Sequence, residues 1–331
     1  MADVTLFRSP DSAELDGFLG DEIARTFPKE ARVALKLHMG EGEKHHFDCR
    51  LTRRCVALLN GAGMKPFLYD SPVMYPGERH TPEDYLKRAA QNGFSEEAMG
   101  CPVVVSDEAR PVEGKFFPIG VSTHLIESDG VLVLSHVKGH PCSGIGGALK
   151  NLGMGGVDRK TKGLLHGGAK PVLTGECDGC GSCVEGCPGS ALEIANDKIR
   201  IDQGSCWGCG RCIDDCPRDA LESQRASFDA LLIDGAAAVV SQLHHTLYVN
   251  DVRKITRLCD CCRDAGPEIA PDVGVLVGTD PVVVDQASVD LAVRAAGEDV
   301  FSRELGRNAY VHIREAAGRG IGTLKYEIRE R

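Results

Sequence analysis

The sequence predicts an α/β protein in which a mostly parallel sheet with flanking helices is interrupted by a small inserted module. Three observations lead to this expectation. Apolar, strand-like segments alternate with helix-like segments before residue 170, and they do so again after residue 225. Between these two parts, cysteines recur at intervals of three or four residues. We therefore expect one α/β domain formed by residues 1–170 and 225–331, with residues 171–224 as an insert.

The first part reads as a strand, a helix and a strand in turn. Residues 33–39 alternate in polarity, residues 52–61 have a helical pattern, and residues 65–70 form a second apolar run. This spacing is typical of a βαβ unit, whose two strands are parallel. A helix is then expected to begin after the N-cap Thr81 and to end at Gly93. Further buried strands are expected at residues 102–107 and 130–136.

The part after the cysteines continues the same alternation. Its helices are expected at residues 227–244, 283–296 and 304–318. Its strands are expected at residues 247–250, 271–280 and 323–329. Because both parts share one kind of architecture, we interpret them as a single domain.

Eight cysteines of residues 171–224 stand in two consecutive runs of the form C-x2-C-x2-C-x3-C-P, the pattern of bacterial two-cluster ferredoxins. The short gaps let one tight loop supply three thiolates, and the fourth cysteine of each run ligates the other cluster. Zinc sites or clusters that only stabilise the fold are the alternatives, although the third cysteine and the Cys-Pro ending disfavour zinc. We expect one 4Fe–4S cluster on Cys177, Cys180, Cys183 and Cys216 and a second on Cys206, Cys209, Cys212 and Cys187.

A segment rich in glycine and basic residues follows the strand at residues 130–136. Open α/β sheets place their ligand sites at the carboxyl ends of strands, where this segment begins. Its glycines would leave backbone N–H groups free to bind an anion, and the alternative is a connector that merely covers the core. The candidate catalytic residues are His38, His136, Lys138, His140 and Lys150, and the candidate anion loop consists of Gly144, Gly146 and Gly147.

A third cysteine group comprises Cys259, Cys261 and Cys262. Three thiols in four residues could hold a metal together with a histidine or a water molecule. Alternatively, two of them could form a redox disulfide, or the three cysteines could be neighbours by chance. The adjacent Asp260 and Asp264, together with Arg263, suggest a polar and exposed stretch.

The charge and composition of the chain limit the classes of partner that it is expected to bind. The net charge of −10 argues against nucleic acid and anionic membrane surfaces. Residues 171–224 carry ten acidic and four basic side chains, so this net charge of −6 suits a docking face for a basic redox partner or simply favours solubility. Neither a signal peptide nor an apolar run long enough to span a membrane is apparent. Cysteines used for clusters indicate a reducing interior, and we expect a cytoplasmic protein.

Several further motifs lie at residues 37–41, 65–70, 134–140, 146–155, 259–261, 273–280 and 285–288. In these motifs the chain resembles the family called "domain of unknown function 362" in its ferredoxin-containing form. The resemblance implies an α/β domain with an inserted two-cluster ferredoxin but implies no defined reaction. A fainter resemblance relates residues 140–150 to the glycine-rich segment of nickel-pincer racemases.

Two functions of different classes follow from the sequence. In the first, an iron–sulfur oxidoreductase passes electrons from an external donor to a small-molecule substrate in the α/β crevice, with an additional metal or organic cofactor as an open question. In the second, the protein is a non-catalytic electron carrier whose α/β part selects the partner. The size of the α/β part favours the first, because a carrier needs only the cysteine-rich segment.

Overall fold

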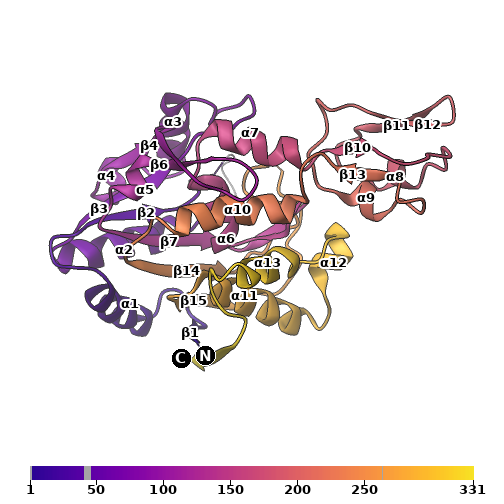
Figure 1. Cartoon of the computed structure of the whole chain (residues 1–331). Helices are drawn as coiled ribbons and strands as arrows, with labels where there is room; N and C mark the ends of the chain where they lie inside the picture. The colour runs from indigo at the N-terminus through magenta and orange to yellow at the C-terminus, as the bar shows by residue number, and fades with distance from the viewer. Residues whose placement is uncertain (1, 41–45, 263) are drawn as a thin grey trace.

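The computed structural model describes residues 2–40, 46–262 and 264–331, and it confirms the predicted mixed α/β fold (Figure 1). Eight strands form one sheet, and five of its seven neighbouring pairs are parallel. In spatial order the strands are β16 (Tyr326–Glu330), β1 (Ala2–Phe7), β15 (Gly274–Gly278), β14 (Thr246–Val252), β7 (Gly130–His136), β2 (Arg32–Lys36), β3 (Lys65–Asp70) and β4 (Val103–Val105). Strand β15 is antiparallel to both of its neighbours.

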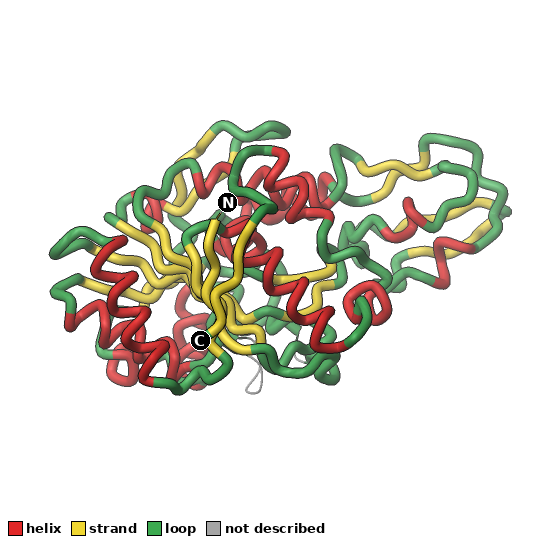
Figure 2. The backbone as a smooth tube through the Cα atoms, turned by 90° about the horizontal axis from the view of Figure 1, so that it is seen from below, coloured by secondary structure: helices red, strands yellow, loops and turns green. Residues whose placement is uncertain are grey.

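Helices cover both faces of this sheet, as the view from below in Figure 2 also shows. Strand β7 explains why two layers are needed: Val131 and Val133 point into one apolar core, and Leu132 and Leu134 point into the other. One layer contains α1 (Ala13–Thr26), α2 (Cys49–Gly61), α3 (Pro82–Gln91) and α4 (Glu96–Met99). The other is built around α6 (Ala148–Gly155), α10 (Phe228–Val240), α11 (Pro281–Ala296) and α13 (Val311–Gly318), with α5 (Thr123–Ile126), α7 (Arg159–Gly168) and α12 (Val300–Leu305) nearby.

Most local predictions are confirmed. Strands β2 and β3 are parallel and are joined by α2, and the Thr81 side chain accepts a hydrogen bond from the Asp84 amide at the start of α3. The single helix expected at residues 304–318 is wrong. Helix α12 ends at Leu305, because Gly306 takes a left-handed conformation with φ of 60°, and α13 begins only at Val311.

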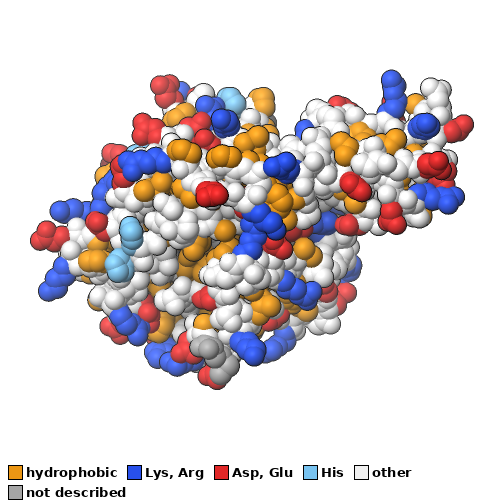
Figure 3. Space-filling view, viewed as in Figure 1, with side chains coloured by type: hydrophobic (Ala, Val, Ile, Leu, Met, Phe, Trp, Pro, Cys, Tyr) orange, Lys and Arg blue, Asp and Glu red, His pale blue; other side chains and the backbone are white. Residues whose placement is uncertain are grey.

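Residues 171–224, which we call the cysteine module, project from the sheet as a separate lobe (Figures 1 and 3). Strand β10 (Pro171–Leu173) pairs with β13 (Leu221–Ser223), so the chain leaves and re-enters the α/β part at adjacent points. The expected hairpin is present as β11 (Leu192–Ala195) and β12 (Lys198–Ile201). The module also holds two short helices, α8 (Ser182–Glu185) and α9 (Arg211–Asp214), and on its visible face acidic and basic side chains are interspersed.

Within the described ranges, no helix has both the length and the apolar character needed to cross a membrane.

Candidate functional site

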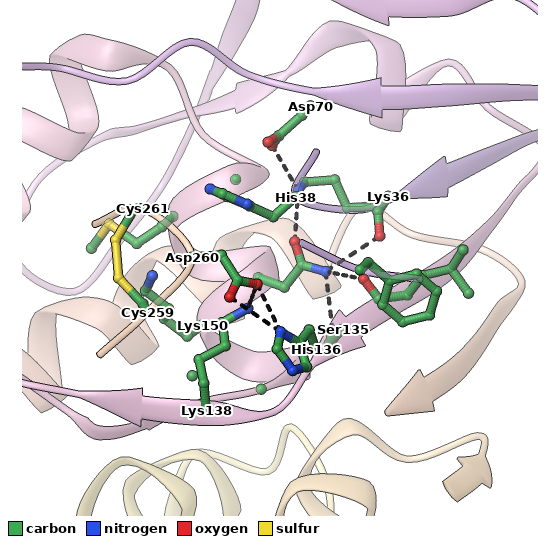
Figure 4. Close-up of a pocket in the computed structure, with 17 residues that line it drawn as sticks. Lys36, His38, Asp70, Ser135, His136, Lys138, Lys150, Cys259, Asp260 and Cys261 are labelled. Carbon is green, nitrogen blue, oxygen red and sulfur yellow. Dashed lines mark hydrogen bonds and ion pairs between the residues drawn. A yellow bond between two sulfur atoms is a disulfide. The ribbon is translucent and has the colours of Figure 1, made fainter. Parts of the chain in front are cut away.

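The carboxyl ends of three neighbouring parallel strands converge on one pocket (Figure 4). Lys36 ends β2, Asp70 ends β3 and His136 ends β7. Helix α6 and the segment around Asp260 close the pocket from the other side. This is the edge of an open α/β sheet at which ligands bind.

A buried ion pair forms the floor of the pocket. The Lys36 Nζ atom lies 2.9 Å from Asp70 Oδ1 and 2.7 Å from the side-chain oxygen of Asn151. The Tyr85 hydroxyl donates to the other Asp70 oxygen at 2.5 Å. Gly155 is required here, because a Cβ at this position would lie 2.2 Å from Lys36 Nζ. Burial lowers the pKa of Lys36, although the Asp70 carboxylate opposes that shift.

Asp260 occupies the centre of a buried charged triad with His136 and Lys138. Its Oδ2 atom lies 2.9 Å from His136 Nδ1 and 2.8 Å from Lys138 Nζ, and its side chain is 1% exposed. The other ring nitrogen of His136 lies 2.9 Å from the Arg253 carbonyl oxygen. Both His136 nitrogens therefore face acceptors, which fits a protonated imidazolium that donates twice. The expectation of an exposed, polar stretch is wrong at Asp260, because the two cations draw its carboxylate inside.

The pKa values of the triad follow from this geometry. Burial disfavours protonation of His136, but the adjacent Asp260 carboxylate outweighs burial and raises its pKa. Burial likewise opposes ionisation of Asp260, yet His136 and Lys138 together hold its pKa well below the usual range. His136 and Lys138 thus anchor the segment that carries Cys259 and Cys261, rather than offering a free base to a ligand.

Burial and neighbouring cations disfavour the protonated form of the two other candidate histidines. His38 Nε2 lies 2.7 Å from an Arg79 nitrogen, and burial followed by this Arg79 charge lowers its pKa well below the usual range. The Nδ1 atom of His140 accepts hydrogen bonds from the backbone amides of Cys142 and Ser143 at 3.3 and 3.2 Å, so its proton resides on Nε2. Burial and then the charge of Lys150 lower the pKa of His140 well below its usual range.

The glycine-rich loop is filled by a carboxylate of the protein itself. Gly144 and Gly146 lie in β9 (Gly144–Gly146), which pairs with β8 (Lys138–His140). The Ala148 and Leu149 amides at the start of α6 donate to Asp285 at 2.7 and 2.9 Å. A Cβ at Gly147 would lie 2.3 Å from the same carboxylate. The two amides that directly follow the expected anion loop of Gly144, Gly146 and Gly147 are therefore hydrogen-bonded to Asp285 rather than open to an external anion.

Lys150 points into the site from α6 and is half-buried. None of the described residues gives its amino group a hydrogen-bond or ion-pair partner. Burial lowers the pKa of Lys150 to about 8, and the charges of Lys138 and Arg79 add to this effect. Lys150 is thus a donor within reach of the cavity, with a proton that is held weakly for a lysine.

The third cysteine group lies beside Lys150. Cys259 and Cys261 form a disulfide, shown in Figure 4. The ligand atoms of these two residues and of Cys262 all lie within 4.8 Å of one another. The group is therefore a possible metal site in its reduced state, since three thiolates at this separation can reach one ion.

The eight cysteines of the cysteine module gather in two small pockets. One is lined by Cys177, Cys180, Cys183 and Cys216, and the other by Cys187, Cys206, Cys209 and Cys212. None of these eight is in a disulfide. The sulfur of Cys187 accepts a hydrogen bond from the Ala191 amide at 3.3 Å, and Cys216 accepts one from Ala220 at 3.4 Å. The fourth cysteine of each run thus lines the pocket of the other run and has an amide donor of its own.

A larger cavity of about 520 Å³ connects the strand-end site with the cysteine module. His38, Lys150 and Cys259 line one side, and Cys206 and Trp207 line the other. The Trp207 carbonyl oxygen accepts hydrogen bonds from His166 Nδ1 at 3.0 Å and from the Cys142 thiol at 3.8 Å. These contacts fix the second cysteine run against the α/β part.

The sequence missed several polar residues of this site, of which Lys162 is an example. Its amino group donates to the Ser71 hydroxyl at 2.7 Å and to the carbonyl oxygens of Ser71 and Pro72. Burial lowers the pKa of Lys162 to about 7. The residues missed are Lys36, Asp70, Arg79, Asn151, Lys162 and Asp260. Lys36 and Asp70 carried a usable signal, since each is a charged residue that ends an apolar strand.

The fold and site define an α/β protein with a polar strand-end pocket and grouped cysteines that offer a possible metal site. More particularly, the chain belongs to the family described as Domain of unknown function (DUF362), whose profile matches residues 33–290. No curated protein matches the chain significantly.

Two solved structures are similar at low identity. A protein from Thermotoga maritima has 9% identity and a TM-score of 0.44, with coverage of 86% of this chain and 58% of its own. The lactate racemase apoprotein from Thermoanaerobacterium thermosaccharolyticum has 11% identity and a TM-score of 0.35, with coverage of 76% and 50% respectively. This chain therefore matches less than two thirds of the length of either protein.

Proposed function

We propose that this chain is an iron–sulfur oxidoreductase, a ferredoxin-containing form of its family, whose cysteine module passes electrons to the α/β site. Its two 4Fe–4S clusters would be held by Cys177, Cys180, Cys183 and Cys216 and by Cys206, Cys209, Cys212 and Cys187. When bound, such clusters supply and accept single electrons. In this proposal residues 171–224 are the inserted ferredoxin module, and residues 1–170 and 225–331 form the substrate domain.

The cysteine pockets support the cluster assignment. Each contains four thiols that are free of disulfides, which is the ligand number of a cubane. Gly179 and Gly208 both have φ of 71°, so the two runs turn in the same way at equivalent positions. Amide donors to Cys187 and Cys216 would stabilise thiolates, and hydrogen bonds of this kind tune cluster potentials.

The observation that carries the oxidoreductase reading is the shared cavity. Cys206, one of the proposed ligands, lines the same 520 Å³ space as His38 and Lys150. A ligand in this space would contact both the electron source and the polar strand-end groups. A carrier needs no such arrangement, because its partner collects electrons at the surface.

The chain's own residues suggest how protons would accompany the electrons. Lys150 has no described partner and a pKa of about 8, so it can hold or release a proton near neutral pH. Lys162 has a pKa near 7, but its amino group is already bound to three oxygen atoms. Lys150 is therefore the better proton donor, whereas the Nε2–H group of His140 can donate a hydrogen bond to a bound molecule.

The external electron donor would be a basic protein that docks on the acidic cysteine module, in the cytoplasm. The net charge of −6 for residues 171–224 supports a basic partner. The thiols of Cys259, Cys261 and Cys262 would hold an additional metal when reduced, as their proximity suggests.

Anaerobic metal and sulfide analysis of the purified chain tests the cluster assignment. Two cubanes require about eight iron and about eight sulfide per chain. Reduction should then give the spectroscopic signal of two reduced clusters. Zinc in place of iron would overturn the proposal. Full iron content with an α/β cavity that binds no small molecule would favour the carrier.

A further inference from the structure

We infer that the cavity binds a small carboxylic acid with an apolar body, with its carboxylate paired to Lys150. This inference deepens the proposed function and rests on it for the role of the bound molecule as substrate. Its evidence comes from the charge balance of the cavity, the occupied amides of α6 and the apolar side chains of the cavity wall.

The first observation is an excess of positive charge. Arg79, Lys150, Lys162 and Lys170 line the cavity, whereas Asp70 is its one carboxylate among the described residues. Asp70 is already paired with Lys36 at 2.9 Å. Deeper in the site, the single carboxylate of Asp260 is shared by His136 and Lys138.

Lys150 is the place where this excess can be balanced by a ligand. Lys162 is bound to three oxygen atoms, and Lys170 donates to the Gln203 carbonyl oxygen. Lys150 has no such partner within the described part of the chain. A half-buried ammonium to which no carboxylate is bonded is unfavourable, and an anion supplied by a ligand removes that cost.

The second observation separates carboxylates from phosphates. Phosphate groups in α/β proteins are bound by backbone amides of a glycine-rich turn and a helix N-terminus. Here the Ala148 and Leu149 amides of that turn donate to Asp285 instead. A single ammonium group remains, which suits a monoanionic carboxylate better than a phosphate with several acceptor oxygens.

The third observation concerns the rest of the ligand. Met74, Tyr75 and Trp207 are large apolar side chains that are 39%, 39% and 42% exposed, and all three line this cavity. Met154 and Phe228 add further apolar surface. The volume of about 520 Å³ is in the range of small-molecule sites. The bound acid should therefore carry an apolar group that covers these side chains.

Binding of four matched probes to the intact iron-loaded chain tests the inference, for example by anaerobic calorimetry. Phenylacetate has both features, phenylacetamide lacks the charge, acetate lacks the apolar body, and phenyl phosphate replaces the carboxylate. We expect phenylacetate to bind most tightly, with a Kd at least tenfold below that of each other probe. Equal binding of phenylacetamide would overturn the role of charge, and tighter binding of phenyl phosphate would overturn the choice of carboxylate.

Substitutions test whether Lys150 is the residue that binds the carboxylate of phenylacetate. Lys150→Met should weaken phenylacetate binding by roughly 30-fold or more, because a buried charge loses its partner. Lys150→Arg should retain most of the affinity. Lys160→Met removes the same charge from an exposed position of α7 and should leave the Kd unchanged. Unaltered binding by Lys150→Met would overturn the inference.

Two controls separate this inference from the proposed function. Far-UV circular dichroism and iron content show whether Lys150→Met is folded; if it is not, the comparison of phenylacetate with phenylacetamide on the wild-type chain decides. Lack of iron in the wild-type chain would overturn the oxidoreductase proposal, whereas lack of phenylacetate binding by a fully loaded chain would overturn only the substrate class.

Discussion

The α/β part buries an eight-stranded sheet between two helix layers, whereas the hydrophobic cluster of the cysteine module contains five buried side chains. Two members of that small cluster, Cys183 and Cys212, are cysteines of the paired runs. Hydrophobic burial can account for the stability of the first region, whereas a small unit with so few core residues usually needs metals or disulfides as well. We therefore expect the module to depend on its proposed clusters to fold, and the α/β part to fold without them.

The cysteine module also differs internally. Its second run touches the α/β part through the Trp207 carbonyl oxygen and through Gly208, where a Cβ would lie 2.7 Å from the His166 carbonyl oxygen. The first run and the β11–β12 hairpin extend away from the sheet (Figure 1). Two runs with one sequence pattern therefore occupy different surroundings, and we expect the second to be the one that exchanges electrons with the cavity.

The largest expected effect is the loss of one proposed cluster from the cysteine module. Cys216→Ser should remove one proposed cluster, which is about four of about eight iron atoms, and the module should become sensitive to protease. The α/β part should keep its circular dichroism, because its cores contain no cluster ligand other than the partly buried Cys209. Iron and sulfide analysis with limited proteolysis would measure both effects.

Cys49→Ser is the matched control for this prediction. Cys49 is half-buried in the α/β part, and its thiol donates to the Asn92 carbonyl oxygen at 2.9 Å, a bond that serine can also make. Its iron content should equal that of the wild type. Full iron in Cys216→Ser would show that Cys216 is not a cluster ligand.

A second, smaller effect should destabilise the α/β part and leave the module alone. Asp260→Ala removes the carboxylate between His136 and Lys138 and leaves two buried cations unpaired. Breaking a buried ion pair in this way costs about 3–5 kcal/mol of the free energy of unfolding. Urea unfolding followed by far-UV circular dichroism would measure this loss, and iron content should be unchanged.

Glu268→Gln provides the reference for that measurement. Glu268 is exposed and lies eight residues after Asp260 in the chain. The free energy of unfolding of the Glu268→Gln variant should therefore stay within about 0.5 kcal/mol of the wild-type value. A similarly small effect of Asp260→Ala would mean that the triad is not formed in solution.

The triad also predicts how stability depends on pH. Burial lowers the pKa of His136 in the folded state, but the Asp260 carboxylate raises it by more, so the net pKa is raised. The protonated form of His136 therefore stabilises the fold. This stabilisation is complete below the unfolded pKa of about 6.5 and is lost as the pH rises through the folded pKa. The free energy of unfolding should therefore fall above about pH 6.5, by at most about 1.4 kcal/mol per pH unit from this group.

Comparison with His136→Gln isolates this contribution. The variant cannot titrate at this position, so the difference in free energy of unfolding between wild type and variant should be largest at low pH and should shrink as the pH rises. A difference that grows with pH would contradict a raised pKa.

How much of the fold can be predicted from the sequence depends on how far apart in the chain the contacting residues lie. The βαβ unit and the Thr81 cap were predictable, because the residues that determine them are neighbours in the chain. The partners of β1 could not be foreseen, since β15 and β16 lie more than 250 residues away. The pairing of strands that distant depends on the whole sheet rather than on a local pattern.

The candidate site shows the same limit. His38, His136 and Lys150 were found because strand ends and glycine-rich turns are recognisable locally. Asp285 accepts a hydrogen bond from the Ala148 amide of α6, which lies 137 residues earlier in the chain. The burial of Asp260 depends on Lys138, which lies 122 residues earlier. Local polarity suggested exposure at Asp260, whereas the distant cations determine that it is buried.

The smallest expected effect concerns the contact that joins the two regions. Arg307 donates to Asp214 of α9 at 3.0 Å and to Asp229 of α10 at 2.7 Å, and so it bridges the cysteine module and the α/β part. The Asp214 side chain is 68% exposed, so Asp214→Asn should cost less than about 1 kcal/mol. The contact should matter more for the orientation of the module than for stability, and protease cleavage near residues 171 and 224 should become modestly faster.

The internal repeat supplies the control for this last prediction. Glu185 stands two residues after Cys183, as Asp214 stands two residues after Cys212, and it is exposed. No described residue of the α/β part bonds to the Glu185 side chain. Glu185→Gln should therefore leave cleavage at the wild-type rate, and high salt should reduce the difference between the two variants, because screening weakens the Asp214–Arg307 pair in the wild type. Equal cleavage of the two variants at low salt would mean that the module is held to the sheet by the Trp207 contacts alone.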